Sequence, residues 1–149
     1  MRGDNFLKVL SMIQPWASLF VLGEIKYETR SWRTRYRGPL AIHASLRTDK
    51  AACRDEPVFS VLAKHGYTET KLPTGVILAT CRLVTCYRVT ENSGESAVLE
   101  EGQEVKGNDY LFGDYRVDHF AWEVEDMTLL PEFIPAKGQL GLWEHPILS

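Results

Sequence analysis

Apolar and polar residues follow one another in blocks that predict short strands and helices. Residues 6–12 form an apolar run without turn-forming residues and predict a strand. The apolar body 16–22 follows Pro15 and stops at Gly23, a pattern typical of a helix that starts near a proline and ends in a left-handed glycine cap. We therefore expect a strand followed directly by a helix.

The rest of the chain continues with both types of element. Residues 39–45, 120–130 and 140–143 predict strands, and the β-branched run 76–89 predicts a long strand whose first half is buried on both faces. Residues 48–65 predict helix, opening at Thr48 or Asp49, with Pro57 starting a second helix. Residues 91–109 are polar, acidic and glycine-containing, which favours a loop.

These elements predict an α+β protein built on a small, mostly antiparallel β-barrel with two or three surrounding helices. The chain has 149 residues and 44% hydrophobic content, which fits one domain over residues 1–149. Within it we expect a helical insert at about 48–70 and an acidic loop at about 91–109.

Composition excludes several classes of site. The apolar stretch 16–22 is too short to span a membrane and lacks the layout of a secretory signal, so we expect a cytoplasmic protein with no membrane partner. Cys53, Cys81 and Cys86 have no CxxC or CxxH spacing, which favours buried free thiols over disulfides or zinc. We predict no metal, no cofactor and no obligate protein partner.

Charge is unevenly distributed along the chain. The net charge is −3, yet residues 24–50 hold seven Lys/Arg against three Asp/Glu, and residues 91–132 hold two against twelve. The basic segment can attract phosphate locally, although the overall charge does not favour encounter with a polyanion. Non-specific, tight binding to duplex DNA is therefore not expected.

The basic segment carries the strongest candidate site. On a regular strand, Lys26, Glu28, Arg30 and Trp32 project from one face, because side chains alternate with period two. Two cations, a carboxylate and an aromatic ring in one row can hydrogen-bond and stack a planar group, of which a nucleobase is the clearest example. On the return strand, Ser45 shares a face with His43 and is a further candidate at the barrel mouth.

Arg33, Arg35 and Arg37 continue the basic character into the following turn, where they surround Tyr36. This arrangement is suited to following a phosphate backbone while an aromatic ring stacks on a base. A solubilising turn is the alternative interpretation of the same charges.

Five stretches of the chain resemble the ASCH domain, a family related to the PUA-like fold. They are SMIQPWASLFVLG, GEIKYETRSW, GPLAIHAS, FGDYRVDHFAWEVEDM and LPEFIPAKGQLGLWEHP, which together span roughly residues 7–47 and 110–145. The resemblance implies a PUA-like barrel with helices around a cleft, linked to the recognition of RNA and modified bases.

The family motif places lysine two, glutamate five and arginine seven residues after a glycine. Gly23, Glu28 and Arg30 match this spacing, whereas Ile25 occupies the lysine position and the lysine is Lys26. A shift of one residue moves a side chain to the other face of a strand unless a bulge intervenes. Glu28 and Arg30 are therefore the firmer site residues.

Two functions follow from the resemblance. The first is a domain that binds single-stranded RNA, or a nucleoside or modified base, in a polar cleft. The second is a cofactor-independent hydrolase, either an amidohydrolase acting on N4-acylated cytidine or a ribonuclease using the same cleft. The catalytic residues would then be Lys26 and Glu28, joined by Glu123 or Glu125. In hydrolytic members a threonine stands at the place of Glu28, whereas here the hydroxyl is at Thr29, which an unbroken strand directs to the opposite face.

Overall fold

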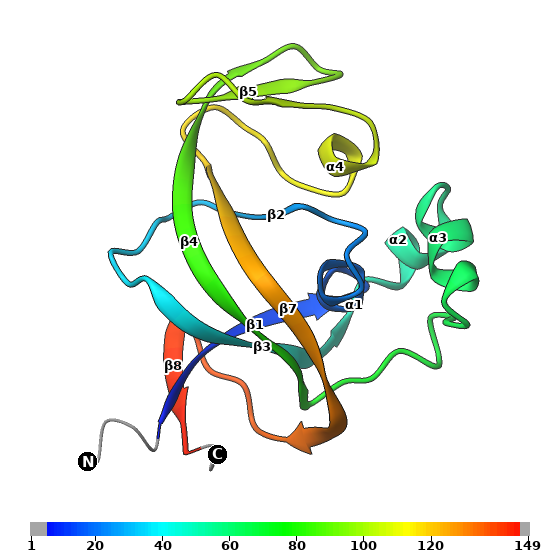
Figure 1. Ribbon diagram of the computed structural model, residues 1–149. Helices are drawn as coiled ribbons and strands as arrows, with labels where there is room; N and C mark the ends of the chain where they lie inside the picture. Colours follow the sequence, from blue (N-terminus) through cyan, green and yellow to red (C-terminus); the bar gives the residue numbers. More distant parts are fainter. Residues whose placement is uncertain (1–5, 147–149) are drawn as a thin grey trace.

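The computed structural model describes residues 6–146, and within this part strands and short helices alternate (Figure 1). The strands are β1 (Leu7–Gln14), β2 (Tyr27–Arg30), β3 (Gly38–Thr48), β4 (Val76–Asn92), β5 (Ala97–Leu99), β6 (Glu104–Val105), β7 (Phe120–Pro135) and β8 (Leu142–His145). The helices are α1 (Trp16–Val21), α2 (Lys50–Arg54), α3 (Val58–Lys64) and α4 (Asn108–Leu111). The protein is of the mixed α+β type, as predicted, with one helix more than expected.

One sheet contains the strands, in the order β2-β7-β4-β3-β1-β8, with β5 added beside β4 and β6 beside β5. All pairings are antiparallel except β1 with β3, which agrees with the predicted antiparallel character. The long strands β4 and β7 curve together across the molecule (Figure 1). Their pairing shifts register at three places. Such irregularities bend a sheet. Among residues 6–146 no ladder joins β2 to β8, so the sheet is open and the predicted β-barrel is not confirmed.

The unit formed by β1 and α1 matches the sequence prediction and depends on a buried amide. Gln14, at the end of β1, accepts a hydrogen bond from the Ser18 backbone N–H at 2.9 Å through its Oε1. Its Nε2 donates to Ser18 Oγ at 2.7 Å and to the Pro73 carbonyl at 2.8 Å. Gly23, with φ of +82°, follows the helix in the left-handed conformation. These bonds fix the start of α1, and with it the position of Trp16.

The segment after β3 contains two short helices, as the sequence predicts. Asp49 caps α2 by accepting a hydrogen bond from the Ala52 backbone N–H at 3.0 Å, and Pro57 directly precedes α3. Neither helix has both the length and the apolar character needed to cross a bilayer, and the same is true of α1 and α4 within the described residues.

The acidic segment 91–109 is more regular than a loop. The strand β5 pairs with the end of β4 and with β6, and Ala97, Leu99 and Val105 are buried together with Val89. These few apolar residues stand among glutamates, so their alternation is a weak signal in the sequence. The short strands form because the protruding end of β4 offers them backbone partners.

The main hydrophobic core lies between the sheet and α1. It includes Leu10, Leu19, Ile42 and the fully buried Trp122. The cysteines Cys53, Cys81 and Cys86 are buried free thiols, as predicted. This core supports the strands whose ends meet at the candidate site.

Candidate functional site

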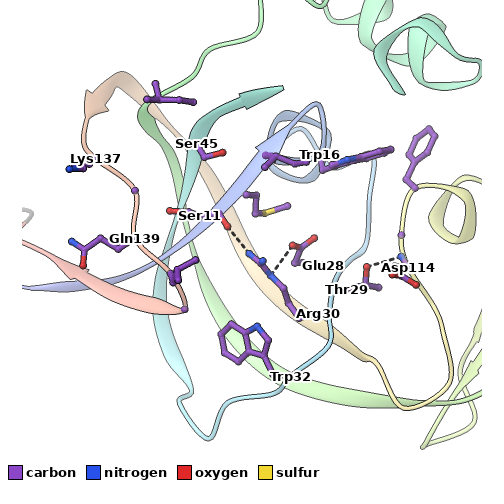
Figure 2. A pocket seen from close by; sticks show the side chains of 18 residues that line it. Ser11, Trp16, Glu28, Thr29, Arg30, Trp32, Ser45, Asp114, Lys137 and Gln139 are labelled. Carbon is purple, nitrogen blue, oxygen red and sulfur yellow. Dashed lines mark hydrogen bonds and ion pairs between the residues drawn. The ribbon is translucent and has the colours of Figure 1, made fainter. Parts of the chain in front are cut away.

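A pocket of about 870 Å³ lies where β1, β2, β3 and the start of α1 come together (Figure 2). Two loops, at residues 112–114 and 137–141, complete its walls. Its volume is near the upper end of the range for pockets that bury a drug-sized ligand. The polar side chains that line it are Ser11, Glu28, Thr29, Arg30, Ser45, Asp114, Lys137 and Gln139.

Glu28 and Arg30 lie next to each other in the pocket. Arg30 Nε is 3.1 Å from Glu28 Oε2, and Arg30 Nη2 donates a hydrogen bond to the Ser11 backbone carbonyl at 2.6 Å. The Arg30 side chain therefore crosses from β2 to β1 and is held at both ends (Figure 2). Because its position is set before a ligand arrives, little conformational entropy is lost on binding.

The Glu28 carboxyl is the ionisable group in the pocket with the most altered proton affinity. Its side chain is 16% exposed, and burial raises the pKa of Glu28 to about 7, against the opposing effect of the nearby Arg30 charge. Near neutral pH the carboxyl therefore exists in both protonation states. It can accept hydrogen bonds as a carboxylate and also donate one as the acid.

Aromatic rings border the pocket on two sides. Trp32 packs edge-on against Trp122 with ring centroids 4.9 Å apart, and the Trp32 carbonyl accepts a hydrogen bond from Trp122 Nε1 at 3.1 Å. Trp16, at the start of α1, lies 6.1 Å from the Phe112 ring, also between centroids. Trp16 lines the pocket and also packs, partly buried, against the main hydrophobic core.

Lys26 does not line the pocket. The strand β2 begins at Tyr27, one residue later than the predicted alternation requires, and the Lys26 backbone N–H donates to Asp109 Oδ1 at 2.9 Å instead of to a strand. The Lys26 side chain is exposed, with Nζ 5.4 Å from the centroid of the Tyr27 ring. Of the predicted row, the structure brings Glu28, Arg30 and Trp32 together and places Lys26 elsewhere.

Thr29 lines the pocket beside the loop 112–114, although regular alternation directs it away from Glu28. Its Oγ1 accepts a hydrogen bond from the Asp114 backbone N–H at 2.8 Å. A Cβ at Gly113 would lie 2.5 Å from Tyr115 Cε2 and 3.2 Å from Thr29 Cγ2. Only glycine lets this loop approach the edge strand so closely, and the loop extends the pocket past β2.

The Asp114 carboxylate is a site residue that sequence reasoning missed. It binds the Arg116 guanidinium through both oxygens, and hydrogen bonding to Arg116 lowers the pKa of Asp114. Asp114 is therefore an anion at neutral pH. The FGD segment in the fourth matched stretch was the only available signal, and nothing in the sequence placed it beside Thr29.

The arginines after β2 form an exposed row outside the pocket. Arg33, Arg35 and Arg37 are exposed, whereas Tyr36 between them packs partly buried against the core. The Arg33 guanidinium carbon is 5.5 Å from the Phe120 ring centroid, and Arg37 Nη1 donates to the carbonyl of Thr34 at 2.7 Å. The row begins one residue after the pocket-lining Trp32.

The two glutamates left open by the sequence are both on β7. Glu123 pairs in register with Tyr27 and accepts a hydrogen bond from Tyr87 Oη at 3.2 Å, and Glu125 is exposed opposite Arg82. Neither residue is among those that line the pocket. Glu28 and Asp114 are the carboxylates that do.

These features describe a mixed α+β domain with a polar pocket bordered by aromatic rings at the edge of its sheet. The ASCH domain family matches residues 10–127, and the chain therefore belongs to the ASCH family. The match includes the helical and acidic segments, which the sequence resemblance had left out, and it ends before the loop 137–141. The family is generally associated with RNA binding. A search of curated proteins found no match.

Proposed function

We propose that this protein binds single-stranded RNA by taking one base or nucleoside, ordinary or modified, into the pocket. The observation that carries the proposal is the Glu28–Arg30 pair, positioned in advance between Trp16 and Trp32 in a chain of the ASCH family. Planar polar rings are bound in proteins by hydrogen bonds to their edges and by stacking on aromatic faces.

Each polar group has a separate role in this proposal. Glu28 pairs with a hydrogen-bonding edge of the base, and Arg30 donates its remaining N–H groups to a carbonyl or phosphate oxygen. Trp32 and Trp16 contact the ring faces, and Ser45 offers a hydroxyl from β3. Lys26 has no role in this arrangement, because its side chain lies over Tyr27.

The proposal is tested by titrating the protein with short single-stranded RNAs and with nucleosides while recording tryptophan fluorescence. Trp16 and Trp32 line the pocket, so occupancy should change their emission. We expect saturable changes with single-stranded RNA and much weaker ones with duplex RNA of the same sequence, whose bases are stacked and paired. Equal responses to both forms, or none to either, would contradict the proposal.

The arginine row is proposed to bind the phosphates that flank the bound base. Replacing Arg33, Arg35 and Arg37 together by alanine should weaken RNA binding about tenfold. The logarithm of the binding constant falls with the logarithm of the salt concentration, and the steepness of this fall should decrease by up to about 2, since each phosphate contact on a single strand contributes about 0.7. Nucleoside binding should stay unchanged, because these side chains lie outside the pocket. An unaltered salt slope would remove the row from the interface.

A second candidate function is hydrolysis of an acyl group on the exocyclic nitrogen of cytidine, and the raised pKa of Glu28, about 7, favours it. A general base acts best when its pKa lies near the working pH. Glu28 would take a proton from the water that attacks the acyl carbonyl, Arg30 would stabilise the resulting oxyanion, and the proton would pass to the leaving nitrogen.

Chromatography after incubation with N4-acetylcytidine distinguishes the two functions. Release of cytidine and acetate that is lost in Glu28→Gln and kept in Lys26→Ala would establish the hydrolase. We expect the Lys26 variant to behave as wild type in either case, because Lys26 does not line the pocket. Binding of the compound without turnover would contradict the hydrolase and would support only the binding function.

A further inference from the structure

One wall of the pocket comes from the tail of the chain. Residues 137–141 line the pocket after β7 ends at Pro135 and before β8 begins at Leu142. This wall lies outside the part of the chain matched by the ASCH family, which ends at residue 127. The wall is held in position by contacts with His43 on β3 and Ser11 on β1.

The buried imidazole of His43 anchors the wall. His43 is 1% exposed on β3, and its Nε2 lies 2.7 Å from the Ala136 carbonyl oxygen. A carbonyl oxygen can only accept, so Nε2 carries the proton. The other nitrogen, Nδ1, is 3.0 Å from Ser11 Oγ, and Ser11 Oγ lies 3.0 Å from Trp143 Nε1, which can only donate.

These contacts are all satisfied by a neutral imidazole. Ser11 accepts from the Trp143 indole and donates its own proton to Nδ1 of His43, while Nε2 of His43 donates to Ala136. Burial lowers the pKa of His43, which favours the same neutral form. The hydrogen bonds thus define one tautomer and one ring orientation.

Gly138 brings the wall into direct contact with this anchor. A Cβ at Gly138 would lie 2.9 Å from His43 Cε1 and 3.0 Å from Ser11 Oγ. Any side chain at this position would therefore move the backbone of the wall away from the imidazole. The lack of a side chain at Gly138 and the hydrogen bond from His43 to the Ala136 carbonyl therefore both determine where the backbone of the wall lies.

Ser11 connects the wall to the Glu28–Arg30 pair. Its hydroxyl belongs to the His43 network, and its backbone carbonyl accepts the hydrogen bond from Arg30 Nη2 at 2.6 Å. Figure 2 shows Gln139 and Lys137 on the opposite side of Ser11 and Arg30 from Trp16 and Asp114. The Glu28–Arg30 pair therefore lies between a part of the pocket that contains Trp16 and Asp114 and a far part that contains Lys137 and Gln139 (Figure 2).

The pocket is open to solvent at residues of the wall and of β3. Leu140, in the wall, is 98% exposed, and Leu46, on β3, is 82% exposed, yet both line the pocket. Lys137 and Gln139 add hydrogen-bond donors there. A ligand whose planar ring binds at Glu28 and Arg30 would reach these residues with the groups attached to that ring.

We propose that residues 137–141 are the specificity wall of the pocket, which recognises the sugar attached to the bound base, and that His43 positions this wall through the preceding Ala136 carbonyl. This inference rests on the proposed function. A nucleoside carries hydroxyl groups that Gln139 and Lys137 can bind, whereas a free base has nothing to reach them.

Two substitutions of His43 separate positioning from bulk stability. In His43→Gln, the side-chain amide can replace Nε2 and keep the bond to the Ala136 carbonyl. In His43→Asn, the shorter amide can replace Nδ1 beside Ser11 but cannot reach Ala136. A third variant, Gly138→Ala, keeps every buried hydrogen-bonding group and displaces the wall directly.

The measured quantity is the ratio of affinities for cytidine over cytosine, and for adenosine over adenine, by fluorescence titration. We expect His43→Gln to keep the wild-type ratio, and His43→Asn and Gly138→Ala to lower it about tenfold, the scale of one lost hydrogen bond. Affinity for the free bases should stay within about threefold in all variants, because the Glu28–Arg30 pair binds the base.

Ratios that stay at the wild-type value in both His43→Asn and Gly138→Ala would overturn the inference while leaving the proposed function intact. Should His43→Asn fail to fold, Gly138→Ala decides the outcome. Wild-type protein that binds none of the four compounds and no single-stranded RNA would refute the proposed function, and the inference with it.

Discussion

Replacing Arg30 by alanine should weaken the binding of single-stranded RNA and nucleosides by about 100-fold or more. Loss of a charged, hydrogen-bonded partner from a binding site typically costs about 2–5 kcal/mol. Here the guanidinium also holds Glu28 and the Ser11 carbonyl in place, through contacts of 3.1 and 2.6 Å. Fluorescence titration of both proteins measures the difference.

Two further variants control for charge and for folding. Arg30→Lys keeps the charge but cannot contact Glu28 and the Ser11 carbonyl together, so we expect most of the affinity to be lost. Lys26→Ala removes a nearby positive charge outside the pocket and should bind as wild type. Equal losses in Lys26→Ala and Arg30→Ala would mean that overall charge, and not the pocket, governs binding.

Replacing Glu28 by glutamine should give a protein whose stability relative to wild type increases as the pH rises from 4.5 to 8. In the unfolded chain the pKa of Glu28 has its ordinary value of 4.5, and burial raises it to about 7 in the folded protein. Between these values the native state retains a proton that the unfolded state has lost. The contribution of Glu28 to the free energy of unfolding is therefore largest below pH 4.5 and is lost as the pH rises through 7.

Urea unfolding at several pH values between 4.5 and 8 isolates this effect, because all other titrating groups are shared by the two proteins. The stability of Glu28→Gln relative to wild type should rise across this range by roughly 1–3 kcal/mol, since one pKa unit corresponds to about 1.4 kcal/mol. Glu132→Gln, at an exposed position on β7, is the matched control and should show almost no trend. A pH-independent difference for Glu28→Gln would contradict the raised pKa.

The order of the elements could be predicted because it follows from local features. Proline and glycine punctuate α1, Asp49 caps α2, and the β-branched run becomes β4. The segment 91–109 was harder to predict, since β5 and β6 owe their pairing to the end of β4 and not to a strong pattern of their own. Which strands form the two edges of the sheet, β2 and β8, likewise depends on pairing between segments far apart in the chain.

The candidate site could be predicted in part for a related reason. Glu28 and Arg30 lie two residues apart on one short strand, so period-two alternation alone places them together. That argument failed for Lys26, because the Asp109 carboxylate, 83 positions further along the chain, takes its backbone N–H outside the strand. A contact of such separation leaves no trace in local periodicity.

The sequence by itself determined the α+β class, the ASCH resemblance and the Glu28–Arg30 pair. Each of these depends on residues close together in the chain, whose geometry is set by backbone periodicity and turn chemistry. Only the tertiary structure decided that Asp114 and residues 137–141 form the walls around that pair and that His43 lies beneath one of them. Packing brings these distant segments together, and two glycines, Gly113 and Gly138, allow the close approach.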